Sequence, residues 1–146
     1  MPNTGPLAYP YEVTQDEEGF FLLTFPDVPE ALTDGESLQE AEAGALDCLL
    51  AALGGYIEGK RDLPRPSRKR SGGKAVLPPL VAAKMALYQA MRDDGITQVE
   101  LAKRTGRDQK DVRRLLDLDH RSHIELVEDA LEKLGRRLVV SVEAAA

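Results

Sequence analysis

The 146-residue chain contains one cysteine, no tryptophan and no apolar run long enough to span a bilayer. A single cysteine, Cys48, excludes an internal disulfide framework and is typical of the reducing cytoplasm. The first residues also lack the charged and then apolar stretches of a secretory signal. We therefore expect a cytoplasmic protein, and the apolar fraction of 42% supports one ordinary domain or two small ones.

Basic residues are absent from the first part of the chain. Residues 1–59 contain twelve acidic residues and no Lys or Arg, a net charge of −12. Residues 60–76 then carry +6, from seven basic residues and one acidic residue, and residues 77–146 carry twelve of each sign, so the total is −6. This asymmetry indicates an acidic module, a basic connector and a mixed module. The acidic module should attract basic partners and repel nucleic acid.

The N-terminal part has the pattern of a small antiparallel sheet. Apolar residues alternate over 8–14, which predicts a strand with one buried face. The run 20–25 is apolar on both faces and predicts a central strand that pairs with the first as a hairpin. A short third strand is expected within 30–34, and the apolar residues 74–77 can add a further strand.

A helix is expected to follow and to pack on this sheet. Ser37 and Glu40 have the spacing of a capping box, in which each side chain bonds a backbone N–H at the helix start. Apolar residues recur at helical spacing from there to about Glu58. Residues 61–73 are rich in Pro, Ser, Gly and charge, which predicts a flexible linker. A first domain over 1–73 and a second over 74–146 follow. The linker includes a basic run that can touch phosphate, although a solvated linker is the commoner outcome: Arg68, Lys69 and Arg70.

The second domain contains two short amphipathic helices within 98–117, after a helix over 79–93. Gly106 separates them, and glycine adopts a positive φ without steric cost. Ala102 is small, which suits closely crossing helices. Thr97 and Asp108 are the predicted N-caps. Two helices joined by a short turn that contains glycine form a helix-turn-helix unit, although any small helical bundle can show this spacing.

The residues outside the apolar stripe of the second helix suit DNA. Gln can pair with adenine, and Arg or Lys with guanine, in the major groove. We therefore expect Gln109, Lys110, Arg113 and Arg114 to face bases. Thr97 and Gln98 are the expected phosphate contacts.

The C-terminal end predicts a subunit contact. A further helix is expected from Ser122 to Gly135, followed by a β-branched strand over 137–142. A lone terminal strand needs a partner, and a second copy of the chain is the simplest one. The residues expected to dimerise are Leu138, Val140 and Val142.

Catalytic and metal sites are not expected. Nuclease chemistry needs clustered carboxylates around two metal ions, but Asp16, Asp27 and Asp34 fall in predicted turns and loops. His120 and His123 have an H-x-x-H spacing, but a zinc site needs about four ligands and the single cysteine is distant in the chain. We expect no enzyme activity, no metal and no cofactor.

Nearly the whole chain resembles the HicB family of antitoxins, in the subtype with a helix-turn-helix. In the N-terminal part, the residues that carry the resemblance are Tyr9, Tyr11, Phe21, the Phe25-Pro26-Asp27-Val28-Pro29-Glu30-Ala31 corner, Thr33, Gly35, Ser37, Glu40 and Ala41. In the C-terminal part they are Ile96, Thr97, Gln98, Leu101, Ala102 and Gly106.

The resemblance implies an α+β fold, in which a truncated RNase H-like sheet with a flanking helix is joined to a helix-turn-helix bundle. It also implies two partners. The first domain would bind and cover HicA, a small basic toxin that cleaves mRNA, and the second would bind operator DNA as a dimer and repress the operon. Among the acidic residues we expect Asp27, Glu30 and Glu40 to contact the toxin.

Two other interpretations stay open at the level of sequence. The chain could be a stand-alone transcriptional repressor whose first domain senses a small ligand. The lack of basic residues before Lys60 disfavours it, and a neighbouring gene for a small basic protein would discriminate. The chain could also be a scaffold whose helix-turn-helix no longer binds DNA, which the balanced charge of residues 77–146 allows.

Overall fold

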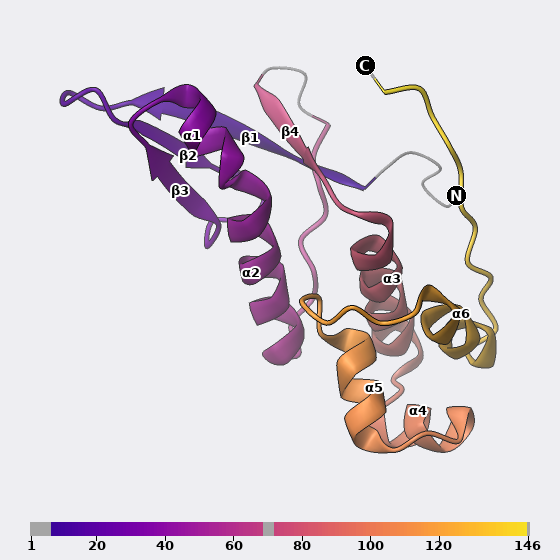
Figure 1. Cartoon of the computed structure of the whole chain (residues 1–146). Coiled ribbons are helices and arrows are strands. Elements are labelled where there is room, and N and C mark those ends of the chain that lie inside the picture. The colour runs from indigo at the N-terminus through magenta and orange to yellow at the C-terminus, as the bar shows by residue number, and fades with distance from the viewer. Residues whose placement is uncertain (1–6, 69–71, 146) are drawn as a thin grey trace. The chain divides into compact units, whose positions relative to one another are not determined.

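The computed structural model describes residues 7–68 and 72–145 (Figure 1). The chain forms two compact units, which divide between Pro78 and Pro79. The division falls after the expected boundary at residue 73 because the segment that follows it is a strand of the first unit. Within the described ranges, no helix is long and apolar enough to cross a membrane.

The first unit contains a four-stranded antiparallel sheet in the order β3-β2-β1-β4. The strands are β1 (Ala8–Gln15), β2 (Phe21–Thr24), β3 (Leu32–Gly35) and β4 (Gly73–Val76). The predicted strands are confirmed, including the central position of β2 between β1 and β3. The mixed α+β class is confirmed as well.

The strand register divides the sheet residues between two faces. Val13 lies opposite Leu23, and Leu23 is fully buried under the helices of the first unit. The next pair on β2 and β3, Leu22 and Asp34, points to the other face because side chains alternate along a strand. Leu22 is 40% exposed and Leu32, on the same face, is 57% exposed. We call this second side the open face of the sheet.

The helix expected from Ser37 to Glu58 is two helices, so the prediction of one helix was wrong. They are α1 (Leu38–Ala43) and α2 (Ala45–Glu58), and Gly44 breaks the run between them. A Cβ atom at Gly44 would lie 3.1 Å from Oγ1 of Thr33. Glycine therefore lets the chain bend where it passes close to β3.

The predicted cap of α1 is confirmed in part. Oγ of Ser37 accepts a hydrogen bond from the Glu40 N–H at 3.1 Å. The Glu40 carboxylate accepts from the N–H of Glu36 at 3.1 Å, whereas a capping box would place this bond on Ser37 itself.

The segment expected to be a flexible linker is tied to the first unit over much of its length. The Tyr9 hydroxyl donates to the Pro64 carbonyl oxygen at 2.7 Å. The N–H and hydroxyl of Ser67 donate to the same oxygen of Asp27 at 2.8 and 3.0 Å. A free linker was therefore the wrong prediction for these residues. Lys69 and Arg70 of the predicted basic run lie outside the described residues.

The second unit is helical. It consists of α3 (Pro79–Asp94), α4 (Gln98–Thr105), α5 (Gln109–Leu116) and α6 (Ile124–Lys133), and these predicted helices are confirmed. Their apolar stripes meet in a core of fully buried or nearly buried side chains. The larger apolar side chains among its fully buried members are Leu87, Leu101, Leu115, Val112 and Val127.

The strand predicted over 137–142 does not form in the single chain. The side chains of Val139, Val140 and Val142 are 77%, 69% and 95% exposed, and Leu138 is half-buried. An isolated strand has no partner for its backbone hydrogen bonds, so β-branched composition alone does not create it.

Candidate nucleic-acid interface and acidic surface

The turn between α4 and α5 is held by local hydrogen bonds. Gly106 has φ +69, and its N–H bonds back to α4, so the residue ends that helix in the left-handed region that glycine favours. Oγ1 of Thr97 accepts from the Glu100 N–H at 3.1 Å, and Oδ1 of Asp108 accepts from the Asp111 N–H at 2.8 Å. Both predicted caps are confirmed, and they fix where each helix begins.

One side of α5 is buried and the other is free. Val112 and Leu115 pack in the core, with exposed fractions of 0% and 2%. The four residues predicted to read bases are all exposed: Gln109, Lys110, Arg113 and Arg114. The structure thus brings them together on the outer surface of one helix.

The basic side chains on this surface differ in whether they form an ion pair. Arg114 lies 3.8 Å from a carboxylate oxygen of Asp111, which partly offsets its charge. Lys110 and Arg113 form no ion pair within the described part of the chain. Of the two predicted phosphate contacts, Thr97 is exposed but already caps α4, and Gln98 is half-buried.

Sequence reasoning missed Lys84, a charged residue with no exposed surface. Its ammonium group donates to three backbone carbonyl oxygens, those of Arg114 at 2.9 Å, Asp117 at 2.6 Å and His120 at 2.7 Å. An ammonium group has three donors, so all are satisfied. Burial lowers the pKa of Lys84, and the nearby Asp117 carboxylate opposes that change. Lys84 therefore joins α3 to the end of α5 and to the loop after it.

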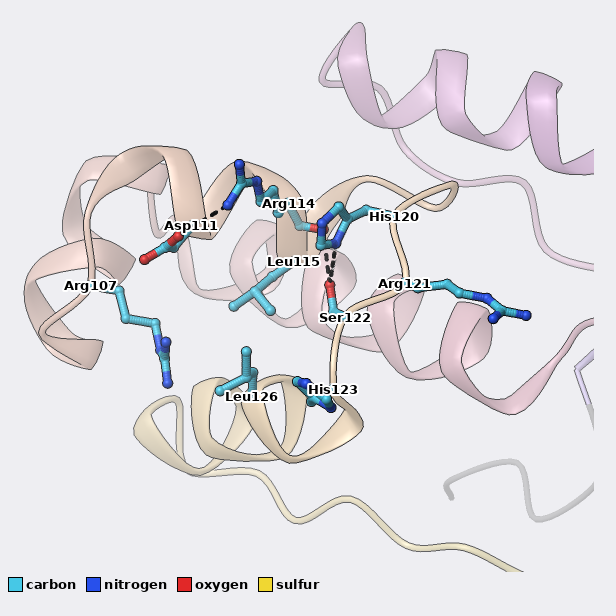
Figure 2. A pocket seen from close by; sticks show the side chains of 9 residues that line it. All are labelled: Arg107, Asp111, Arg114, Leu115, His120, Arg121, Ser122, His123 and Leu126. Atoms are coloured by element: carbon cyan, nitrogen blue, oxygen red, sulfur yellow. Dashed lines mark hydrogen bonds and ion pairs between the residues drawn. The ribbon is translucent and has the colours of Figure 1, made fainter.

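A pocket of about 250 Å³ opens between α5, the following loop and α6 (Figure 2). The polar residues that line it are Arg107, Asp111, Arg114, His120, Arg121, Ser122 and His123, and the apolar ones are Leu115 and Leu126. Nδ1 of His120 lies 3.0 Å from Oγ of Ser122. No cluster of three or more potential metal ligands occurs in residues 7–68 and 72–145.

The three carboxylates predicted to meet the toxin all have partners within the first unit. The Asp27 carboxylate accepts a hydrogen bond from the Ser67 N–H, and the Glu40 carboxylate accepts one from the Glu36 N–H. Glu30 accepts from the Tyr56 hydroxyl at 2.7 Å and pairs with Arg61 at 3.3 Å. The pKa of Glu30 is lowered, first by the Tyr56 hydrogen bond.

The first unit also contains two buried tyrosines whose pKa values are raised. Burial raises the pKa of Tyr9 to about 12 and that of Tyr11 to about 12. The Tyr11 hydroxyl also donates to the Glu42 carboxylate, which favours the neutral phenol. Cys48 is half-buried, and burial raises the pKa of its thiol above the usual value.

Comparison with known proteins identifies the family. Residues 8–86 match the family model described as HicB-like antitoxin of bacterial toxin-antitoxin system. The chain belongs to the HicB-like antitoxin family. It is 39% identical over 144 residues to Antitoxin HicB of Pseudomonas fluorescens (strain Pf0-1), covering 97% of this chain and 99% of that protein.

Further relatives agree along most of the chain. Antitoxin HicB of Escherichia coli (strain K12) is 39% identical over 133 residues, covering 90% of this chain and 96% of the relative. Antitoxin HicB 1 of Photorhabdus laumondii subsp. laumondii is 38% identical over 138 residues, covering 94% and 88%. The similarity thus extends well beyond the 8–86 match, and the antitoxin assignment fits a non-enzymatic role.

We predict that Lys84→Met destabilises the second unit by about 3 kcal/mol, because three buried carbonyl groups lose their donor. Hydrogen exchange measured by mass spectrometry would show faster exchange in α3 and α5, with the sheet of the first unit unchanged. Lys110→Met removes an exposed lysine from the same unit and should leave exchange unaltered. Equal exchange in both variants and the unmodified protein would contradict the role given to Lys84.

Proposed function

We propose that this antitoxin has two binding activities. The first unit binds and inhibits a small basic toxin of the HicA type, which cleaves mRNA. The second unit binds operator DNA as a dimer and represses the operon. The exposed face of α5, with two cations that have no ion pair in the described chain, is the observation that carries the DNA-binding half.

The α4–α5 pair is proposed to be a helix-turn-helix with α5 as the recognition helix. The Gly106 turn and the two caps support this, because they present α5 as a rigid element with its polar side outward. Gln109, Lys110, Arg113 and Arg114 are the proposed base-reading residues, and their amide and guanidinium groups suit base edges in the major groove. Thr97 and Gln98 are the proposed phosphate contacts.

Arg113→Ala should weaken operator binding by roughly 1–3 kcal/mol if the guanidinium reads a base. Fluorescence anisotropy with a duplex from the chain's own promoter would measure this, and an unrelated duplex would report the lost sequence preference. The toxin should bind the variant as tightly as it binds the unmodified protein. Unchanged operator affinity would rule out base reading by Arg113.

Dimerisation is proposed to involve the C-terminal residues after α6. Leu138, Val140 and Val142 alternate along this segment, and the two valines are largely exposed in the single chain. Pairing with the same segment of a second copy would satisfy its backbone groups and bury this apolar surface. A dimer would place two α5 helices about 34–36 Å apart, one turn of DNA.

Val140→Asp should convert the dimer to a monomer, since two carboxylates would have to be buried against apolar neighbours. Size-exclusion chromatography with light scattering gives the mass directly, and circular dichroism should show unchanged helix content. Glu143→Asp, a conservative change in the same segment, is the control. A dimeric Val140→Asp variant would place the subunit contact elsewhere.

Toxin binding is proposed for the first unit, whose sheet and flanking helices we take to be a truncated RNase H-like fold. Residues 1–59 carry twelve carboxylates and no basic residue, and the whole unit, which includes the basic residues of 60–76, keeps a net charge of −6. Asp27, Glu30 and Glu40 are the proposed contacts. Because Asp27 and Glu30 are held by internal hydrogen bonds, they offer a preorganised acidic surface to a basic partner.

Glu40→Gln tests the charge of Glu40 without removing its hydrogen bond. A glutamine side chain can still accept the hydrogen bond from the Glu36 N–H, so α1 keeps its start, but the negative charge is lost. We expect toxin association to slow several-fold with little change in dissociation, as for a charge at an interface rim. Glu58→Gln at the far end of α2 is the matched control. Stopped-flow rates that are equal for both variants would remove Glu40 from the interface.

A further inference from the structure

The pocket between α5 and α6 has an excess of positive charge. Three arginines and two histidines are among the residues that line it, against one aspartate, although Figure 2 shows the head group of Arg121 turned outward. That carboxylate, Asp111, is paired with one of the three, Arg114. Arg107 and Arg121 make no ion pair within the described residues. The pocket therefore suits an anion.

Arg107 supplies the second observation. It lies in the turn between α4 and α5, and its side chain extends toward Leu126 of α6 (Figure 2). Its Nε–H is buried and has no hydrogen-bond partner among the described residues. A ligand cannot reach an N–H that protein atoms enclose, so the terminal amino groups of the guanidinium are the donors that Arg107 offers to an anion.

The apolar part of the lining narrows the class of anion. Leu115 and Leu126 face the same pocket as the arginines, and Figure 2 shows them between α5 and α6. A bare inorganic anion gains nothing from such a surface. A sugar–phosphate unit carries an anionic phosphate next to an apolar deoxyribose face, and a pocket of about 250 Å³ can hold it.

We propose that this pocket binds one phosphodiester of the DNA backbone, with Arg107 as its principal donor and Arg121, Ser122 and His123 at its rim. The inference rests on the proposed DNA binding by α5 and extends it, because Thr97 and Gln98 were the expected phosphate contacts. Arg114 lines the pocket and is also a proposed base-reading residue on α5, so the two contacts are adjacent.

The pocket is built on a fixed loop. Lys84 holds the carbonyl groups of Asp117 and His120, which precede the rim residues. The hydroxyl of Ser122 lies between His120 and the last turn of α5, 3.4 Å from the carbonyl oxygen of Arg114. Phosphate binding here would set the position of α5 along the groove, because phosphate contacts fix register and base contacts supply specificity.

The test compares Arg107→Gln with Lys133→Gln, which removes one charge from α6 outside the pocket. The full-length protein is titrated with its promoter duplex and with an unrelated duplex at several salt concentrations. Arg107→Gln should weaken binding to both duplexes by a similar factor, about tenfold, and reduce the slope of log affinity against log salt by about 0.9. Lys133→Gln should change neither. Arg121→Gln, at an exposed position, gives a second variant if Arg107→Gln folds poorly.

A second arm uses promoter duplexes with a neutral methylphosphonate at one position at a time. Neutralising the phosphate at one position should weaken DNA binding by the unmodified protein but should not weaken binding by Arg107→Gln any further. Normal DNA binding by Arg107→Gln and Arg121→Gln, with an unchanged salt slope, would overturn the pocket inference and leave the proposed function standing. If the unmodified protein does not bind the promoter duplex, both the pocket inference and the proposed DNA binding are overturned. If Arg107→Gln and Arg121→Gln lose binding of inorganic phosphate to the same extent but keep their DNA affinity, the pocket binds a free anion. That result would overturn the backbone contact.

Discussion

The buried ammonium group of Lys84 joins α3 to the end of α5 and to the loop that follows it. Three carbonyl oxygens from the end of α5 and the loop after it point at one nitrogen. The last carbonyl groups of a helix have no partner inside the helix, so a cation from α3 both satisfies them and favours the negative end of the helix dipole. The direction of α5, the path of the loop and the shape of the pocket all depend on this arrangement.

Local rules written in the sequence predicted much of this architecture. Period-two alternation predicted the hairpin, and period-3.6 stripes with Thr97 and Asp108 as caps predicted α4 and α5, because each signal depends on a few neighbouring residues. The exposed face of α5 followed from the same stripe. What failed depended on contacts between distant residues. The break at Gly44 arises from the approach to Thr33, which no helical pattern encodes.

Lys84 and Arg107 escaped prediction for the same reason. A lysine within an amphipathic helix is ordinarily solvated, and only the fold shows that Lys84 points inward to three carbonyl groups from a segment some thirty residues later. The residues of the predicted linker posed the converse problem. Their Pro- and Ser-rich composition indicated freedom, but Tyr9 and Asp27 provide hydrogen-bond partners that composition cannot reveal.

The position of β4 separates the charge boundary of the chain from its folding boundary. The acidic stretch ends at Gly59, but the sheet is complete only when residues 73–76 have paired with β1. A fragment cut at the end of the acidic stretch would leave β1 as an uncovered edge, with backbone groups free to template pairing with other chains. During synthesis the same edge stays open until β4 has emerged from the ribosome. The antitoxin therefore acquires its acidic residues before its four-stranded sheet is complete.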